Sequence, residues 1–277
     1  MSTKLAVVGG GRMGEALVGG LVAAGWARPE ELCVVERLAG RRRELAGRFP
    51  GVAVVDRVPS ADGAVVAVKP GDVAGACAEL VEAGVGRVLS IAAGVSLTAL
   101  EAALGEVPVV RAMPNTAALV GAGAAAIAAG TRAGEAELTW AEEVLGAVGE
   151  VVRVPEPLLD GVTGLSGSGP AYVFLVAEAL IDAGVLVGLP HDTSRRLALQ
   201  TLLGAARLLT ETGQSPQSLR TAVTSPGGTT AAGLRALEAA GARSAVIEAV
   251  VAATARSREL CDAPTSPSSP SATTGLQ

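Results

Sequence analysis

The feature that most constrains the fold is an alternation of short apolar runs with helix-forming stretches, between residue 4 and about residue 154. The apolar runs are rich in Val, Leu and Ile with little polar alternation, which suits strands buried on both faces. Helices between consecutive strands imply parallel pairing. We therefore expect a doubly wound α/β domain. Its strands are predicted at Leu5–Val8, Leu32–Glu36, Val52–Val55, Ala64–Val68, Val88–Ile91, Val107–Arg111 and Val151–Val154, and its helices begin near Arg12, Ala39, Asp72, Leu97 and Gly134.

After Pro155–Pro157 the strand signals stop and the chain is rich in Ala, Leu and Val with helical spacing. The stretch Gly169–Gly188 is apolar on most faces, so a helix there has to be buried. A domain of roughly a hundred residues buries such a helix most easily against a second subunit, so we expect self-association. The predicted helices are Leu158–Thr163, Gly169–Gly188, Asp192–Thr212, Gln217–Val223, Thr229–Ala240 and Arg243–Cys261.

A glycine-rich turn of the form G-x-G-x-x-G joins the first predicted strand to the first helix. Gly9 permits the tight turn, Gly11 lets backbone amides approach a pyrophosphate, and Gly14 lets the helix pack closely on the strand. The chain has 36 glycines, so chance register is the alternative, but the strand and helix context favours a nucleotide site. We expect a Rossmann-type dinucleotide-binding domain over residues 1–155, an all-helical domain over 156–262, and a Pro/Ser/Thr-rich disordered tail over 263–277.

The end of the second predicted strand carries Glu36 and Arg37, about 20 residues past Gly14. A carboxylate there accepts hydrogen bonds from the adenosine ribose and favours NAD, whereas an arginine favours the 2′-phosphate of NADP. The residues Arg41 to Arg43 follow, either as added positive charge or as a solvated helix face. These residues alone leave the choice of cofactor open.

Three further strand ends carry candidate cofactor residues, because ligands of open α/β sheets bind beyond the carboxyl ends of the strands. Lys69, one of two lysines in the chain, can contact cofactor hydroxyls or phosphate from the segment Ala67, Val68, Lys69 and Pro70. The small residues Ala92, Ala93 and Gly94 leave room for a nicotinamide ring. Asn115, the only asparagine, can bond the carboxamide or its neighbouring loop, or cap a turn.

A second glycine turn, with the sequence S-P-G-G-T-T, opens a predicted helix in the helical part. Gly227 and Gly228 lie between hydroxyl residues, Ser225 before them and Thr229 and Thr230 after them. Several backbone amides at the positive end of a helix suit a carboxylate or a phosphate. An anion site is therefore favoured over a simple helix cap.

Composition excludes several classes of protein. A net charge of −5 without a basic stripe argues against nucleic acid or anionic lipid as the main partner. The three cysteines, Cys33, Cys77 and Cys261, are far apart and form neither a disulfide framework nor a metal-ligand spacing. The apolar stretch near the N-terminus is too short for a signal peptide, and glycines interrupt the other apolar runs before about 20 residues. We expect a cytoplasmic protein with no metal site and no membrane span.

From about Lys4 to Leu260 the chain resembles the pyrroline-5-carboxylate reductase family. The resemblance rests on six motifs in matching order and separation: V-V-G-G-G-R-M-G, A-V-K-P, S-I-A-A-G, R-A-M-P-N-T, G-S-G-P-A-Y and V-T-S-P-G-G-T-T. It implies a dinucleotide-binding domain and a helical domain that interlocks in a dimer, with further assembly up to decamers. It also implies an active site formed between subunits.

Carried over by position, the resemblance implies that Ser225 to Thr230 hold the carboxylate of 1-pyrroline-5-carboxylate, with the catalytic Thr230 near the ring nitrogen. NADPH is implied more often than NADH, which stays possible. Two departures are Ala117, where the family usually has Pro, and Glu36-Arg37, which is not a clear phosphate-binding pair. The implied cofactor contacts are Gly9, Gly10, Gly11, Arg12, Met13, Gly14, Lys69, Ala92, Ala93 and Gly94.

The implied reaction is hydride transfer to the C=N bond of the pyrroline, which gives L-proline in the last step of proline biosynthesis. A protonated imine is already a strong electrophile, which suits a chain with one histidine and no paired carboxylate motif. His191 is expected beside a helix start, and Tyr172 and Trp140 in packing. The alternatives are a related imine oxidoreductase, a β-hydroxyacid-type oxidoreductase and a non-catalytic dinucleotide-binding regulator. Enzymes of the β-hydroxyacid type depend on a lysine in the helical domain, and this chain has no lysine after Lys69. A regulator would need no anion site in the helical domain.

Overall fold

The computed structural model describes residues 3–262, which form two compact units. The first unit contains residues 3–167 together with 253–262, and the second contains residues 168–252. Residues 156–167 and 253–262, which the sequence assigned to the helical domain, group with the sheet in this division. The predicted disordered tail, 263–277, lies outside the described residues.

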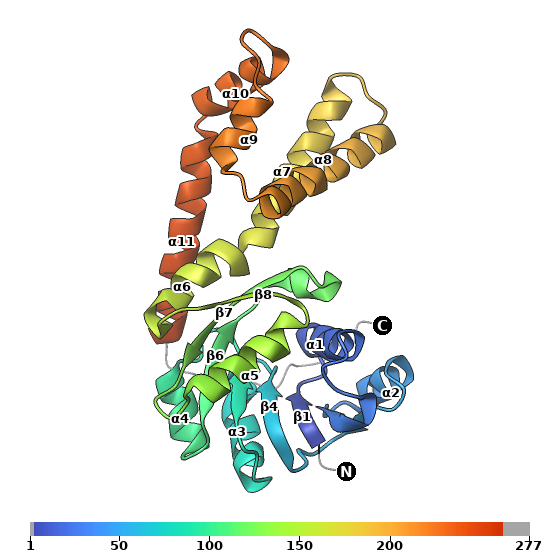
Figure 1. Cartoon of the computed structure of the whole chain (residues 1–277), viewed down its shortest axis with the longest axis vertical. Helices are drawn as coiled ribbons and strands as arrows, with labels where there is room; N and C mark the ends of the chain where they lie inside the picture. The colour runs from blue at the N-terminus through green and yellow to red at the C-terminus, as the bar shows by residue number, and fades with distance from the viewer. Residues whose placement is uncertain (1–2, 263–277) are drawn as a thin grey trace, which may run out of the picture. The chain divides into compact units, whose positions relative to one another are not determined.

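The first unit is built on one eight-stranded sheet with the order β3-β2-β1-β4-β5-β6-β7-β8 (Figure 1). Every neighbouring pair is parallel except β6 and β7, which are antiparallel. The order reverses beside β1, the topological switch point at which open α/β sheets bind ligands. The strands are β1 (Thr3–Val8), β2 (Leu32–Val35), β3 (Ala53–Val55), β4 (Ala61–Val66), β5 (Val88–Ser90), β6 (Val109–Met113), β7 (Gly123–Ala129) and β8 (Gly149–Arg153).

The seven predicted strands are all present, and β7 is an eighth that the sequence did not indicate. Its sequence, G-A-A-A-I-A-A, contains one β-branched residue, and alanine has a low preference for strands. The prediction of parallel pairing is wrong at this place, because β7 follows β6 after only a short connection containing the 3₁₀ turn η3 (Thr116–Val120). A short connection of that kind reverses the chain direction.

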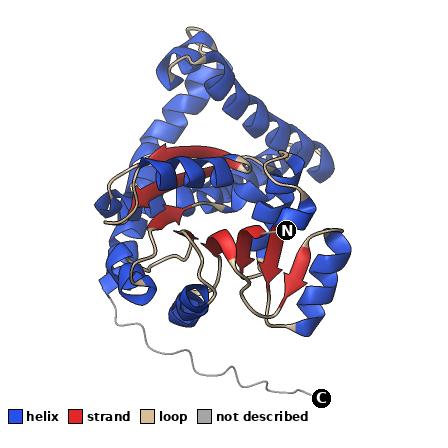
Figure 2. Ribbon diagram, turned by 60° about the horizontal axis from the view of Figure 1, so that its bottom comes forward, coloured by secondary structure: helices blue, strands red, loops and turns tan. Residues whose placement is uncertain are grey.

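Helices cover both faces of the sheet (Figure 2). Two clusters of buried apolar side chains form the cores of this unit. One core includes Leu17 of α1 and Trp140 of α5, and the other includes Leu80 of α3 and Leu100 of α4. Successive residues of each inner strand contribute to opposite cores, which explains the uninterrupted apolar runs in the sequence. These helices are α1 (Arg12–Ala23), α2 (Ala39–Arg48), α3 (Val73–Glu82), α4 (Leu97–Leu104) and α5 (Glu135–Gly146).

The second unit consists of helices, as the sequence predicted, but it encloses few buried side chains. Ser194 and Ala198 of α8 are buried, and Gly184 of α7 lets the two helices approach so closely that a Cβ there would overlap the Ser194 side chain. On α7, Phe174 is 62% exposed and Leu186 is 88% exposed. The elements are α7 (Gly169–Leu186), α8 (His191–Thr212), α9 (Pro216–Ala222), α10 (Thr229–Ala239) and α11 (Ala242–Asp262), whose last ten residues belong to the first unit.

Candidate active site

The first glycine turn lies between β1 and α1, and its geometry explains two of its glycines. Gly9 has φ +111°, and a Cβ there would lie 2.5 Å from the carbonyl oxygen of Ala67. A Cβ on Gly14 would overlap the carbonyl oxygen of Gly9, so the helix can lie this close to the strand only with glycine. Gly11 has no atom within 4 Å of the place of a Cβ, so the turn is open on its outer side. An open turn at a helix N-terminus fits the diphosphate of a dinucleotide.

A cavity of about 350 Å³ continues from this turn along the carboxyl ends of β1, β2 and β4. It brings together many of the predicted cofactor residues, namely Gly9, Gly11, Glu36, Arg37, Ala67, Val68 and Lys69. The α3 side of the cavity adds Asp72, Ala76 and Glu79, which the sequence did not indicate. The cavity therefore lies where the adenosine half of a dinucleotide binds in folds of this class.

The carboxylate of Glu36 is directed at the glycine turn. Its Oε2 accepts a hydrogen bond from the Gly10 N–H at 3.1 Å, and its Oε1 accepts one from the Leu38 N–H at 2.8 Å. A Cβ on Gly10 would lie 2.5 Å from Leu45 Cδ1 and 3.0 Å from Glu36 Oε2. Glu36 therefore fixes the turn as well as lining the cavity.

One arginine, Arg37, lines the cavity, and the trio Arg41 to Arg43 follows it in the chain without lining the cavity. Arg37 forms an ion pair of 2.8 Å with Glu79. Arg41 donates to the Gly10 carbonyl at 2.9 Å, and Arg42 donates to the carbonyls of residues 36 and 37 at 2.9 Å and 2.7 Å. Arg43 is exposed. Two arginines of the trio thus support the backbone of the site, and one belongs to a solvated face.

The other predicted cofactor residues lie outside this cavity, at neighbouring places in the first unit. Pro70 begins the 3₁₀ turn η2 (Pro70–Asp72), and Arg12 and Met13 are the first residues of α1. Ala92 is buried, and Gly94 has φ +74° in the loop after β5. The site residues therefore share one edge of the sheet, where its parallel strands end.

Asn115 follows β6 and bonds its neighbouring loops. Its Oδ1 accepts from the N–H groups of Ala117 and Ala124 at 3.2 Å and 3.1 Å, and its Nδ2 donates to the Ser166 carbonyl at 3.0 Å. It thus joins the loop after β6 to the π-helical turn of residues 163–167. This is one of the roles that the sequence allowed, and contact with a carboxamide stays a prediction.

The second glycine turn lies in the second unit, before α10. Gly227 has φ +70°, and a Cβ on Gly228 would overlap the Ser225 hydroxyl. The Gly228 N–H donates to the Ser225 carbonyl at 3.0 Å, which closes the turn. Gly228 is the N-cap of α10, where no side chain caps the helix, so the first backbone amides point out at its positive end. The turn has the form of an anion site.

Comparison with known proteins gives the family. Residues 156–260 match the family described as pyrroline-5-carboxylate reductase dimerisation, and residues 4–94 match the family described as NADP oxidoreductase coenzyme F420-dependent. The pyrroline-5-carboxylate reductase of Synechocystis sp. is 47% identical over 94% of this chain and 99% of that one. The chain belongs to the pyrroline-5-carboxylate reductase family.

Solved structures agree with this family. The pyrroline-5-carboxylate reductase from Coxiella burnetii has a TM-score of 0.89 with 38% identity, over 95% of this chain and 100% of that one. The pyrroline carboxylate reductase of Plasmodium falciparum, solved with NADP bound, has a TM-score of 0.80 with 29% identity, over 94% and 98% of the two chains. The resemblance and the fold class drawn from the sequence are confirmed.

As a pyrroline-5-carboxylate reductase, the chain is an NAD(P)H-dependent oxidoreductase that acts on a C=N bond. This confirms the enzyme class expected from the motifs, in preference to the β-hydroxyacid-type enzyme and the non-catalytic regulator. His191, the single histidine, is exposed at the start of α8. In residues 3–262, no three His, Cys, Asp or Glu side chains are grouped so that they could hold a metal ion.

The match to a dimerisation family also explains the exposed helices of the second unit. One helical stretch, Glu156–Leu186, is long and apolar enough to cross a membrane by length and composition, and 6% of its most apolar window is buried. A single helix of that kind is weak evidence for a membrane, because an interface helix has the same composition. Residues 156–260, which match the dimerisation family, include all of α7, in agreement with the self-association expected from the sequence.

Proposed function

We propose that this chain reduces 1-pyrroline-5-carboxylate to L-proline, with NADPH as the cofactor and NADH as a possible substitute. The observation that carries the proposal is the presence of two glycine turns with separate tasks. The turn after β1 is open at a helix N-terminus for a diphosphate, and the turn before α10 offers uncapped amides for a carboxylate. A dinucleotide sensor needs the first turn and has no use for the second.

The dinucleotide would be held along the carboxyl edge of the sheet. The glycine turn and the N-terminus of α1 would hold the diphosphate, and the cavity beside Glu36 and Lys69 would hold the adenosine half. The small residues after β5 would leave room for the nicotinamide ring. The proposed contacts are Gly9, Gly10, Gly11, Arg12, Met13, Gly14, Glu36, Arg37, Ala67, Val68, Lys69, Pro70, Ala92, Ala93, Gly94 and Asn115.

The substrate would be held by the segment Ser225–Thr230. Backbone amides at the start of α10 bind its carboxylate, assisted by the hydroxyls of Ser225 and Thr229 and by the close approach that Gly227 and Gly228 allow. The Thr230 hydroxyl holds the ring nitrogen by a hydrogen bond, which fixes the orientation of the C=N bond. Thr230 is therefore the proposed catalytic residue.

The chemistry needs few protein groups. The bound reduced nicotinamide supplies the hydride that the imine carbon accepts, which is C2 of 1-pyrroline-5-carboxylate and becomes C5 of proline, while the ring nitrogen of the protonated imine becomes the amine nitrogen of proline. The chain contributes orientation and exclusion of water, and correct positioning contributes as much as about 7–11 kcal/mol to lowering such barriers. No general acid is required, because the imine is protonated before reaction.

We propose a dimer formed through the helical unit, with assembly beyond the dimer up to a decamer, because the exposed apolar residues continue over α7, α8 and α11. We propose a cytoplasmic location, in keeping with the free thiols of Cys33 and Cys77 in the core.

The test is an absorbance assay of cofactor oxidation by the purified protein, with 1-pyrroline-5-carboxylate and either NADPH or NADH. Thr230→Val should lower kcat/KM about 10- to 100-fold, the value of one hydrogen bond to a charged group, and leave cofactor affinity unchanged. Thr221→Val is the matched control, because that hydroxyl is bonded to the Gln217 carbonyl on α9. Absence of oxidation with both cofactors would refute the proposed function, and full activity of Thr230→Val would refute the role of Thr230.

A further inference from the structure

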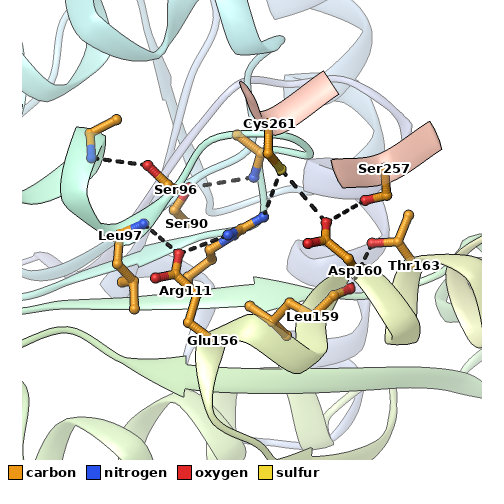
Figure 3. A network of polar contacts seen from close by, with 12 residues as sticks. Ser90, Ser96, Leu97, Arg111, Glu156, Leu159, Asp160, Thr163, Ser257 and Cys261 are labelled. Carbon is orange, nitrogen blue, oxygen red and sulfur yellow. Dashed lines mark hydrogen bonds and ion pairs between the residues drawn. The ribbon is translucent and has the colours of Figure 1, made fainter. Parts of the chain in front are cut away.

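A partly buried charged network lies in the first unit, apart from the proposed cofactor and substrate contacts (Figure 3). Its centre is Arg111, on β6, which is 8% exposed. The guanidinium donates to Glu156 Oε1 at 2.7 Å and to the sulfur of Cys261 at 3.7 Å. Arginine is rarely buried without partners, so these contacts keep its charge compensated.

Each partner of Arg111 belongs to a different segment of the chain. Glu156 begins the 3₁₀ turn η4 (Glu156–Leu158), and the same Oε1 accepts the N–H of Leu97 at 2.6 Å. Leu97 is the first residue of α4, so the carboxylate lies at the N-terminus of that helix, where negative charge is favoured. The network thereby fixes the point at which the loop after β5 enters α4.

On its other side the network reaches the end of α11. The Cys261 thiol donates to Asp160 Oδ1 at 3.7 Å, and the Ser257 hydroxyl donates to the same oxygen at 2.7 Å (Figure 3). Burial is the main cause that raises the pKa of Cys261, so the thiol keeps the proton that this contact needs. Asp160 lies in α6 (Leu159–Val162), which the network joins to α11.

The loop between β5 and α4 lies between these two anchors. It contains Ala92, Ala93 and Gly94, and its first hydrogen bond runs from the Ala92 N–H to the Ser90 hydroxyl at 3.4 Å. A Cβ on Gly94 would lie 4.0 Å from the carbonyl oxygen of Leu260 on α11. Ser90 and Arg111 are paired in register on β5 and β6. Arg111 thus lies at the base of the loop that the proposed function assigns to the nicotinamide end.

We propose that Arg111 is a positioning residue that holds the loop of residues 91–96 in place for the nicotinamide end of the dinucleotide, through Glu156 at α4 and through Cys261 at α11. The inference rests on the proposed function, which places the ring beside this loop. Arg111 itself acts through its partners and is separated from the adenosine cavity, whose lining does not include it. Loss of the Arg111 side chain should therefore weaken binding of the nicotinamide half of the cofactor and leave binding of the adenosine half unchanged.

Two ligands separate the halves in a binding experiment with the full-length assembled protein. NADPH occupies both halves, whereas 2′,5′-ADP lacks the nicotinamide and occupies the adenosine half alone. In Arg111→Gln, isothermal titration calorimetry should show a Kd for NADPH raised about 10-fold, and a Kd for 2′,5′-ADP within about twofold of the wild type. The kcat should fall in the same variant, while the KM for the imine stays unchanged.

Two more conservative variants keep the test valid if Arg111→Gln does not fold. Glu156→Gln keeps an oxygen that accepts from Leu97 and Arg111 but removes the charge, and Arg111→Lys keeps the charge but reaches fewer partners. Both should give a smaller change in the same direction. Arg153→Gln is the matched control, because Arg153 on β8 pairs with Glu135 and Glu142 far along the sheet from this loop, and it should leave both Kd values unchanged.

The possible results distinguish the two proposals. Equal weakening of NADPH and 2′,5′-ADP in the Arg111 and Glu156 variants would show a general structural role and overturn the inference, as would unchanged binding of both ligands. A wild-type protein that binds neither ligand would refute the proposed function, and with it the inference. Selective weakening of NADPH supports the inference.

Discussion

The two units of this reductase differ in how they bury their apolar side chains. The sheet unit encloses its own core on both faces, and residues such as Leu5, Leu89 and Leu100 are completely buried. In the helical unit, many of the large apolar side chains of α7, α8 and α11 are exposed in the single chain. One unit is stabilised by its own packing and the other by contact with another copy, which the match to a dimerisation family identifies.

The largest expected effect comes from charging the exposed helix. Phe174→Glu places a carboxylate in a surface that association buries, which costs several kcal/mol, so the protein should sediment as a monomer at micromolar concentration. Activity should fall with it, since the proposed substrate turn lies in the same unit. Val120→Glu, at a side chain 81% exposed in the sheet unit, is the control and should stay assembled. An assembled Phe174→Glu protein would mean that α7 is not in the interface.

The next largest effect is on stability, and it compares a side chain buried within the chain with one that only a partner subunit would bury. Leu89→Ala removes a completely buried side chain of β5 and should lower the free energy of unfolding by about 2–5 kcal/mol in urea, whatever the state of assembly. Leu203→Ala on α8 changes a half-exposed side chain. Its cost should be below about 1 kcal/mol in the monomeric Phe174→Glu background and larger in the assembled protein. Equal costs in both backgrounds would contradict burial of α8 by a partner.

A smaller effect should change the choice of cofactor in the sheet unit and leave association unaffected. Glu79→Gln removes the carboxylate that pairs with Arg37 at 2.8 Å and leaves the guanidinium available for a 2′-phosphate. Because the pair is partly exposed and screened, the ratio of kcat/KM for NADPH over NADH should rise about 3- to 10-fold. Glu82→Gln, the same change on the same helix, is the control. An equal rise in the control would assign the effect to net charge.

The smallest effect concerns the core cysteines, whose rate of labelling should not change when assembly is lost. Burial raises the pKa of Cys33 and Cys77 to about 11, so roughly one thiol in a thousand is the reactive thiolate at pH 8. Labelling by a disulfide reagent should be slow and should accelerate about tenfold per pH unit up to that pKa. The same slow labelling is expected in Phe174→Glu, because both thiols are buried within the core of the sheet unit itself. Rapid labelling of both core thiols in that variant would show that the units are not independent.

Much of the sheet unit could be predicted from the sequence, since strands that are buried on both faces leave uninterrupted apolar runs. The missed strand, β7, is mostly alanine, so no local pattern separates it from a helix. The first glycine turn was also predictable, because its signal is local: Gly9 and Gly14 are required by close backbone contacts and lie in one short motif.

The residues that sequence analysis missed lie far from the motifs in the chain. Glu79 meets Arg37 across 42 residues, and Glu156 meets Arg111 across 45. Neither carboxylate belongs to a local pattern, and only the strand order brings each beside its arginine. The exposure of α7 was predictable in part, since an apolar helix in a small domain requires a partner.

The chain leaves the sheet unit at residue 167 and returns to it at residue 253, so the helical unit is an insertion rather than an appendage. Both covalent ends of the insertion are tied into the same body, and the Asp160–Ser257 hydrogen bond of 2.7 Å lies close to where they meet. A single protease cut between α8 and α9 would consequently not release a fragment: the two pieces would stay joined through the sheet unit and separate only when that unit unfolds.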